Sequence, residues 1–378
     1  MSFRTSPTRR RCLQWSAATL AVPSLVRAAD ELLIGQSITL QGGKNVYGSD
    51  VLAGVKVLFE AVNRDGGVNG RRLSLRTLDD DNQAAVAEAN ARRLVAEGVL
   101  LLFGSIEGGP SGAVMKAAID TGTPFFGPMA GSPGLRRPFQ PLVFPVRAEH
   151  RDEFRALIRY GVDTGLKRVA LFHADSDTGR EHLENVRLLA EEARMGFGGG
   201  AAFKGDASDA QLDAVAATLA GRQVDLVLNH GSPGVYERLI RGARAAGHRT
   251  SFWGVNSGSS PMAAALGPLA RGMVFAQIVP SPFARKTALA REYQARWRAM
   301  SATAPFSYGS LEGYMTAKAL VRALRAAGPA PTRASLLKGL QDFETDLGGV
   351  HLRYRGTEHD GSRFVDLAMV GSDGQFIQ

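Results

Sequence analysis

The sequence predicts an α/β protein with two doubly wound, Rossmann-like lobes. Three observations carry this prediction. Short apolar strands alternate with amphipathic helices along most of the 378 residues, which is typical of parallel sheets covered by helices. The alternation restarts near residue 150, and a chain of this length can bury two cores. Polar, glycine-rich loops follow many of the strands, at the edge where open parallel sheets bind ligands.

The first strand–helix–strand unit begins with "LLIGQS" (32–37), which predicts a strand. Apolar residues then recur at helical spacing from Val51 to Val62, and the alternating pattern of residues 73–78 predicts the next strand. Between them, Gly66-Gly67 and Asn69-Gly70 are turn signals, because glycine enters the left-handed backbone region without a steric penalty. Together these elements begin a parallel sheet.

Three aspartates, Asp79 to Asp81, end this second strand. They could form a metal site, or they could cap the next helix, predicted at 84–97. Adjacent side chains on an extended chain do not converge on one ion. We therefore expect Asp80 or Asp81 to be the helix N-cap, where a carboxylate accepts backbone N–H bonds and is favoured by the helix dipole.

The remaining elements follow the same alternation. A buried strand at 99–104 precedes a helix around 114–119. We expect further helices at 152–160, 181–194, 209–219, 235–245, 285–300, 311–326 and 332–343, and further strands at 168–173, 201–203, 224–230, 251–255, 272–280, 349–355 and 363–371.

Residues 1–28 predict a signal peptide, since a basic start precedes an apolar core and the small-residue motif Val26-Arg27-Ala28. We expect export to the periplasm, by the twin-arginine route, which "TRRRCL" resembles, or by the ordinary secretory route. The single cysteine, Cys12, lies in this segment, so disulfides are excluded from the rest. Residues 1–28 hold five arginines and no acidic residue, and without them the net charge falls from +9 to +4. Nucleic-acid binding therefore loses its main support.

The sequence lacks the common catalytic and cofactor motifs: the phosphate loop, a strand-linked G-x-G-x-x-G, the G-x-S-x-G elbow and H-E-x-x-H. The seven histidines, including His150, His173, His230 and His351, are scattered without ligand spacing. We expect each of them on the surface or in a loop. These observations predict no catalytic residue, no metal site and no cofactor.

Six polar loops remain, each after a predicted strand. In the second, Gly104–Gly112, glycines leave backbone N–H groups to face an anion at a helix N-terminus, and Ser105 and Ser111 could add hydroxyl donors. A carboxylate fits such a site. The six loops are either flexible connectors or the walls of one cleft. They comprise residues 37–48, 104–112, 127–134, 173–179, 229–234 and 254–260.

Several of these stretches resemble the periplasmic leucine/isoleucine/valine-binding protein family, the type I solute-binding receptors of ABC importers. The resemblance rests on residues 34–83, on "LFGSIEGGPSGAVMKAAIDTGTPFFGPMAG" (102–131), on "QIVPSP" (277–282) and on "SYGSLEGYMTAKALVRAL" (307–324). It implies two lobes that close on a small amino acid or related carboxylate. The implied partners are an inner-membrane ABC permease and its ATPase, and the implied state is a monomer without a cofactor.

The resemblance also implies three crossover strands, near 144–147, 276–280 and 348–350. Lobe 1 would then comprise 29–146 and 280–349, and lobe 2 would comprise 147–279 and 350–378. Carried over residue by residue, the ligand-binding positions are Tyr47, Ser105, Glu107, Gly108, Met129, Ala130, Gly131, Ser132, Asp177, Thr178, Ser232 and Asn256.

Two of these positions depart from the amino-acid-binding members. Asn256 stands where those members have an acidic residue, and Gly131 lacks the expected hydroxyl, although Ser132 is adjacent. Both departures weaken recognition of an ammonium group, unless Glu107 or Asp177 supplies the charge. Two alternatives stay open: a ligand-sensing regulatory domain of the same fold, and an α/β hydrolase or dehydrogenase.

Overall fold

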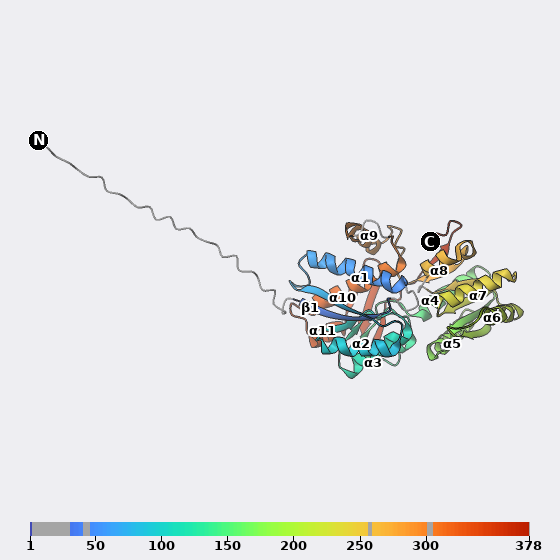
Figure 1. Cartoon of the computed structure of the whole chain (residues 1–378), viewed down its shortest axis with the longest axis horizontal. Helices are drawn as coiled ribbons and strands as arrows, with labels where there is room; N and C mark the ends of the chain where they lie inside the picture. Colours follow the sequence, from blue (N-terminus) through green and yellow to red (C-terminus); the bar gives the residue numbers. More distant parts are fainter. Residues whose placement is uncertain (2–30, 41–45, 256–258, 301–304, 378) are drawn as a thin grey trace.

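The chain forms two parallel-sheet lobes in a computed structural model that describes residues 1, 31–40, 46–255, 259–300 and 305–377 (Figure 1). The first sheet has the strand order β2-β1-β3-β4-β5, and the second has the order β15-β14-β10-β9-β8-β6-β7. In Figure 1, helices α1–α3 and α9–α11 surround the first sheet, and α4–α8 surround the second. The predicted two-lobed α/β fold is confirmed.

The first lobe is built from alternating strands and helices in chain order. Every neighbouring pair of strands in its sheet is parallel. The elements are β1 (Glu31–Ile38), α1 (Val46–Arg64), β2 (Arg72–Asp79), α2 (Ala84–Ala96), β3 (Leu101–Phe103), α3 (Gly108–Asp120), β4 (Phe125–Phe126), the short 3₁₀ helix η2 (Pro133–Leu135) and β5 (Val143–Phe144).

The second lobe continues the pattern. Its strands β7, β6, β8, β9 and β10 are parallel, and only β14 and β15 run antiparallel to their neighbours. The elements are α4 (His150–Asp163), β6 (Arg168–Ala174), α5 (Asp177–Glu192), β7 (Gly196–Phe203), α6 (Asp209–Gly221), β8 (Leu226–His230), α7 (Pro233–Ala245), β9 (Ser251–Gly254), α8 (Ser259–Leu266), η3 (Gly267–Ala270) and β10 (Val274–Gln277).

The last part of the chain returns to the first lobe and then adds the edge of the second sheet. Helix α10 packs along α1, and a three-stranded sheet, β11-β12-β13, lies beside β5. The elements are α9 (Ala288–Met300), α10 (Tyr308–Ala326), α11 (Arg333–Leu340), β11 (Glu344–Asp346), β12 (His351–Arg355), β13 (Glu358–Gly361), β14 (Asp366–Val370) and β15 (Phe376–Ile377).

The third passage between the lobes follows this small sheet. Tyr354 Oη on β12 donates a hydrogen bond to the carbonyl of Pro145 at 2.8 Å, which holds the sheet against β5. Strand β14 then pairs with β10 of the second sheet. The chain therefore passes to the second sheet between β13 and β14, whereas the resemblance placed a crossover at 348–350.

The turn between α1 and β2 forms as its residues predict. Asn69 and Gly70 both have positive φ angles, of 52° and 83°, and the turn closes with a bridge between Val68 and Arg71. Asn63 then pairs with β2, because its side chain accepts from Leu73 N at 2.8 Å and donates to Leu73 O at 2.9 Å. This amide thus fixes the end of the helix against the strand.

The aspartates after β2 are structural, but they do not cap α2. The N-cap of α2 is Gln83, so the expectation of Asp80 or Asp81 there is wrong. Asp80 is fully buried and accepts from Thr39 Oγ1 at 2.6 Å and Ser37 Oγ at 3.1 Å. Burial raises the pKa of Asp80, and these hydroxyl bonds oppose part of that rise. The carboxylate ties β2 to β1.

Helices α1 and α10 of the first lobe cross closely. A Cβ atom on Gly54 of α1 would lie 1.8 Å from the carbonyl oxygen of Ser310 on α10, and one on Gly313 would lie 2.1 Å from that of Val51. Only glycine permits this distance between backbones. The crossing brings together Tyr47 on α1 and Glu312 on α10, whose side chains are hydrogen-bonded.

Candidate functional site

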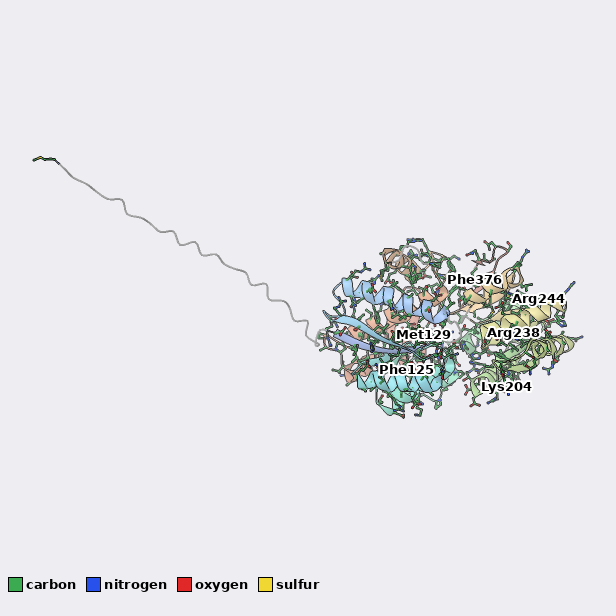
Figure 2. All side chains as sticks on the ribbon, in the orientation of Figure 1. Phe125, Met129, Lys204, Arg238, Arg244 and Phe376 are labelled. Atoms are coloured by element: carbon green, nitrogen blue, oxygen red, sulfur yellow. The ribbon has the colours of Figure 1, made fainter. Side chains whose placement is uncertain are left out.

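The candidate site lies where the two sheets present loops to each other. Two of these loops meet directly: a Cβ atom on Gly108, at the start of α3 in the first lobe, would lie 3.9 Å from Cγ2 of Thr178 on α5 in the second. Figure 2 locates Phe125 and Met129 in the first lobe and Lys204, Arg238 and Arg244 in the second. Residues predicted from both lobes are therefore brought together.

The loop after β3 is shaped by its own hydroxyls. Ser105 Oγ donates to Ser111 Oγ at 2.7 Å, and Ser111 Oγ donates to the carbonyl of Ile106 at 3.3 Å. Both serines are fully buried, whereas Glu107 is exposed with a positive φ of 63°. The first bond of α3 runs from Ser111 N to Glu107 O, so the amides of Gly108 and Gly109 precede the helical hydrogen-bond ladder.

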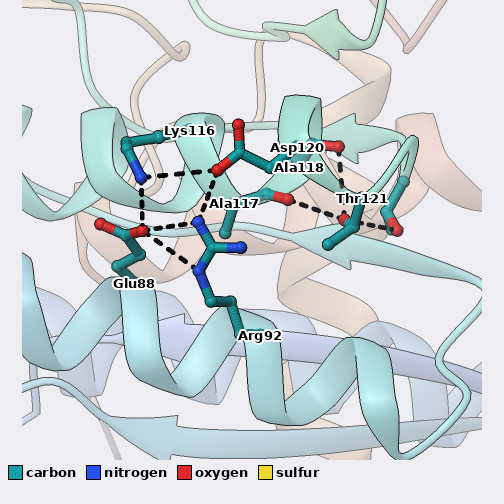
Figure 3. A network of polar contacts seen from close by, with 8 residues as sticks. Glu88, Arg92, Lys116, Ala117, Ala118, Asp120 and Thr121 are labelled. Carbon is teal, nitrogen blue, oxygen red and sulfur yellow. Dashed lines mark hydrogen bonds and ion pairs between the residues drawn. The ribbon is translucent and has the colours of Figure 1, made fainter.

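Helix α3 is positioned by an ion network on its outer side (Figure 3). Glu88 of α2 accepts from Arg92 of the same helix at 2.7 Å and from Lys116 of α3 at 2.6 Å. Arg92 also reaches Asp120 of α3 at 2.5 Å. These exposed bridges contribute little individually, but together they connect the two helices along their length.

The second loop of the first lobe, Met129–Ser132, is held from behind by a buried arginine. Met129 N donates to the carbonyl of Ser105 at 2.7 Å, which joins this loop to the one before α3. Arg136 donates to the carbonyls of Ala130 at 3.4 Å and Ser132 at 3.3 Å. Burial lowers the pKa of Arg136 to about 10, so the guanidinium stays protonated at neutral pH.

A buried charge network crosses the hinge between the lobes. Arg147, fully buried in the first crossover, contacts Glu153 on α4, and its Nη1 lies 3.7 Å from Oε1 of Glu312 on α10. Tyr47 Oη donates to Oε2 of Glu312 at 2.5 Å. Burial alone would lower the pKa of Arg147, but the two carboxylates outweigh it and raise that pKa. Burial and the charge of Glu312 raise the pKa of Tyr47.

Three histidines converge beside this network. His150 begins α4, His182 lies on α5 and His230 ends β8, and one ring nitrogen of each lies within 4.8 Å of the others. The expectation that these side chains lie in loops or at the surface is wrong for His150 and His182, which are 5% and 0% exposed. His173 is also buried, whereas His351 is exposed as expected.

Burial is the main cause that keeps these imidazoles neutral. It lowers the pKa of His182 well below its ordinary value, helped by repulsion from His230 and His150. The pKa of His230 is lowered well below the ordinary value for the same kind of reason, with His150 and His173 as the neighbours. Burial also lowers the pKa of His150, although the Glu153 carboxylate opposes this shift.

The histidines lie against the first lobe as well as within the second. His150 N donates to the carbonyl of Gly131 at 3.0 Å, and a Cβ atom on Gly131 would lie 2.6 Å from Cγ of the His150 ring. The sequence predicts that Gly131 weakens the recognition of an ammonium group, because it lacks a hydroxyl. In the structure a glycine is needed at this position, because only glycine leaves room for the His150 imidazole.

The other predicted positions of the second lobe are less enclosed. Asp177 is 94% exposed in its side chain and pairs with Arg180 at 2.6 Å, so its charge is directed to solvent. Ser232 caps α7, where its hydroxyl accepts from Val235 N at 3.4 Å. Thr178 is half-buried. Asn256 lies outside the described residues.

Within the described residues, no helix combines the length and the apolarity that crossing a membrane requires. The buried polar residues of the candidate site that motif searches missed are Arg147, Glu153, Glu312 and His182. A partial signal existed for His230, because it ends a predicted strand at the edge where such sheets bind ligands.

Known proteins resemble this chain over nearly its whole length. The profile of the family described as "Periplasmic binding protein" matches residues 31–375. A leucine-, isoleucine-, valine-, threonine- and alanine-binding protein of Pseudomonas aeruginosa is 25% identical over 365 residues, which cover 92% of this chain and 93% of that protein.

Solved structures agree in fold. A possible leucine/isoleucine/valine-binding protein from Rhodopirellula baltica superposes with a TM-score of 0.85 at 25% identity, covering 95% of this chain and 98% of that one. A substrate-binding periplasmic protein from Ralstonia solanacearum superposes with a TM-score of 0.81 at 24% identity, covering 92% of this chain and 99% of that one. This likeness concerns the fold alone.

Proposed function

Since the chain belongs to the periplasmic binding protein family, we propose that it is the solute receptor of an ABC importer. The resemblance to leucine/isoleucine/valine-binding proteins is confirmed, and this is a family of binding proteins rather than of enzymes. In our proposal the lobes close over a small amino acid or related carboxylate, and the closed receptor delivers it to a permease and its ATPase.

The observation that carries this proposal is the approach of Gly108 in one lobe to Thr178 in the other. Both residues follow the carboxyl ends of parallel strands, β3 and β6, where open α/β sheets bind ligands. A solute at this junction would contact both lobes, so its binding energy would favour the closed arrangement over an open one.

We assign the carboxylate of the solute to the start of α3. The amides of Gly108 and Gly109 precede the helical ladder there, and the helix dipole favours an anion. A Cβ atom on Gly108 would lie 2.8 Å from Ser132 Oγ, so that hydroxyl is close enough to add a donor. Ser105 and Ser111 bond each other and so shape this loop.

The remaining proposed contacts enclose the rest of the solute. Tyr47 would form the wall on the first lobe, and Thr178, Ser232 and Asn256 would face it from the second.

We propose that the first lobe comprises residues 29–146 and 280–349, and that the second comprises residues 147–279 and 350–378. Strands β12 and β13 are the exception, because they accompany the first lobe. We also propose that residues 1–28 are removed on export and that the receptor is a monomer. N-terminal sequencing of the exported protein should then begin at or near Ala29.

A thermal-shift screen tests the function directly. Amino acids, short carboxylates and aromatic acids are added singly, and a solute that binds only the native state raises the melting temperature. With that solute, small-angle scattering should show compaction, and the solute should be recovered unchanged after incubation. No stabilising solute in any class, or chemical conversion of the solute, would overturn the proposal.

A further inference from the structure

We propose that His150, His182 and His230 form a binding site for one divalent transition-metal ion of the zinc class. Three imidazoles from α4, α5 and β8 present ring nitrogens within 4.8 Å of one another. Neutral imidazole is a ligand that zinc, copper, nickel and iron share. Among the described residues, this is the one group of three or more histidine, cysteine or acidic side chains whose ligand atoms converge in this way.

The hydrogen bonding of these rings requires an explanation that packing does not give. Buried polar atoms are nearly always hydrogen-bonded. Yet both ring nitrogens of His182, and Nδ1 of His230, are buried without a hydrogen-bond partner. The rings of His182 and His230 also lie only 3.9 Å apart between centroids, tilted by 54°. A bound cation would give one nitrogen of each of these rings a partner.

The third histidine is already oriented as a metal ligand. Nδ1 of His150 lies 2.9 Å from Oε1 of Glu153. Since a carboxylate only accepts, the proton lies on Nδ1, and the lone pair of Nε2 is left for another partner. This carboxylate–histidine arrangement is the usual outer support of metal-binding imidazoles. Arg147 contacts the same carboxylate and so fixes Glu153 in turn.

The surroundings suit a metal that is partly shielded from solvent. The Phe154 ring lies 5.6 Å from the His182 ring and 6.4 Å from the His150 ring, and Gly131 covers His150 from the first lobe. Nitrogens bound tetrahedrally at about 2.0–2.1 Å from zinc lie about 3.3 Å apart. The observed separation of up to 4.8 Å must therefore shorten by up to about 1.5 Å when the metal binds.

Three protein ligands leave a coordination position for water or another small donor, as in open zinc sites. The cluster adjoins the Met129–Ser132 loop through Gly131, so a metal here would lie at the junction of the lobes. The metal site itself does not depend on the identity of the solute, because all three ligands belong to the chain.

The test uses the full chain without an affinity tag of histidines, freed of metal by a chelator and then dialysed. Calorimetric titration with ZnCl₂ should give one equivalent bound per chain, and ZnCl₂ should raise the melting temperature. Co²⁺ should give the visible absorption of a four-coordinate ion, and a chelator should abolish it. The absence of stoichiometric binding by both metals would overturn the proposal.

Variants of the proposed ligands and of their support show which side chains bind the metal. His182→Gln loses no hydrogen bond, so it should fold, and it should weaken zinc binding more than about 100-fold, since loss of a supporting residue alone costs 10–100-fold. Glu153→Gln should weaken it within that smaller range. If Glu153→Gln fails to fold, the result for His182→Gln decides.

The matched control is His173→Gln, because His173 is buried on the neighbouring strand and has its Nδ1 3.0 Å from the carbonyl oxygen of Ala174. It should bind zinc as the parent chain does. Unchanged binding by His182→Gln, or an equal loss in His173→Gln, would overturn the assignment.

Discussion

The carboxylate of Glu153 contacts both Arg147 and His150, so one side chain supports the hinge cation and one ring of the histidine cluster. Arg147 precedes α4 in the crossover, and Glu312 approaches it from the first lobe at 3.7 Å. The hinge therefore contains one buried cation between carboxylates of two lobes.

We expect Arg147→Met to destabilise the protein by about 3–5 kcal/mol, because it leaves Glu153 and Glu312 buried without their cation. Urea unfolding measures the free energy. Arg187→Met is the matched control: Arg187 pairs with Glu184, and these side chains are 44% and 56% exposed, so the loss should stay below about 1 kcal/mol. Equal losses in the two variants would contradict a special role for the buried cation.

Asp80→Ala should cost about 1–3 kcal/mol of unfolding free energy, since the hydroxyls of Ser37 and Thr39 lose their buried acceptor. Asp65→Ala, at an exposed position of the same strand–helix–strand unit, should change stability by no more than about 0.5 kcal/mol. Adding Ca²⁺ or Mg²⁺ should not raise the melting temperature of the parent chain through these aspartates. A rise that Asp80→Ala abolishes would restore the metal interpretation.

Two glycines on helices should respond to alanine with opposite signs. Gly54→Ala should destabilise by about 1–3 kcal/mol, because its Cβ would lie 1.8 Å from the Ser310 carbonyl and force α1 away from α10. Gly112→Ala on α3 meets no atom within 4 Å and should gain about 0.5–1 kcal/mol from helix propensity. Thermal and urea unfolding of both variants measure this. A stabilising Gly54→Ala would show that the helices are not in close contact.

Stability should fall as the pH drops below about 6.5, and His359 should contribute to the fall. Burial lowers the pKa of His359 below its ordinary value of 6.5, although its bond to the Val143 carbonyl at 3.0 Å opposes the shift. The unfolded chain therefore takes up the proton first as the pH falls, and unfolding is favoured. Above pH 6.5 both states are neutral at this residue and its contribution is constant.

The free energy of unfolding, measured at pH 7 and at pH 5 with a chelator present, tests the contribution of His359. His359→Gln should show a smaller loss between the two pH values than the parent chain, because His150, His182 and His230 remain in both proteins. An identical pH dependence would contradict the assigned role of His359.

Local elements were predictable because their causes are local. The spacing from Val51 to Val62 and the Asn69-Gly70 turn place α1 and β2 without knowledge of the rest of the chain. The role of Asp80 was not predictable in this way, since its partners lie on β1, and only the register Ile38 to Asp79 brings them together. The sequence indicated a structural aspartate but not its partner.

The histidine cluster and the hinge charges depend on topology. His150 and His182 belong to helices. His230 lies beside them only because β8 lies between β6 and β9 in the sheet. Glu312 meets Tyr47 because α10 returns to α1 late in the chain. No spacing in the sequence encodes such contacts. The strand–loop–helix arrangement of residues 101–120, in contrast, was predictable because its parts are contiguous in the sequence.

The head group of the solute gives the last prediction. We propose that the solute carboxylate binds the amides at the start of α3, whereas Asn256 is neutral at the position where the resemblance implies an acidic residue in amino-acid-binding members. An ammonium buried without a counter-charge loses hydration that neutral acceptors only partly replace. We therefore expect a deaminated analogue of a bound amino acid to bind within about tenfold, roughly 1.4 kcal/mol.

Calorimetry with matched pairs, such as leucine and 4-methylpentanoate, checks this, and Asn256→Asp should shift preference toward the amine. Removal of the carboxylate, as in 3-methylbutylamine, is the control and should abolish binding. If the parent chain binds leucine tightly and rejects its deaminated analogue, another carboxylate supplies the counter-charge. Glu107 would then be the acid to change first, because Asp177 is directed to solvent and Glu312 faces Arg147.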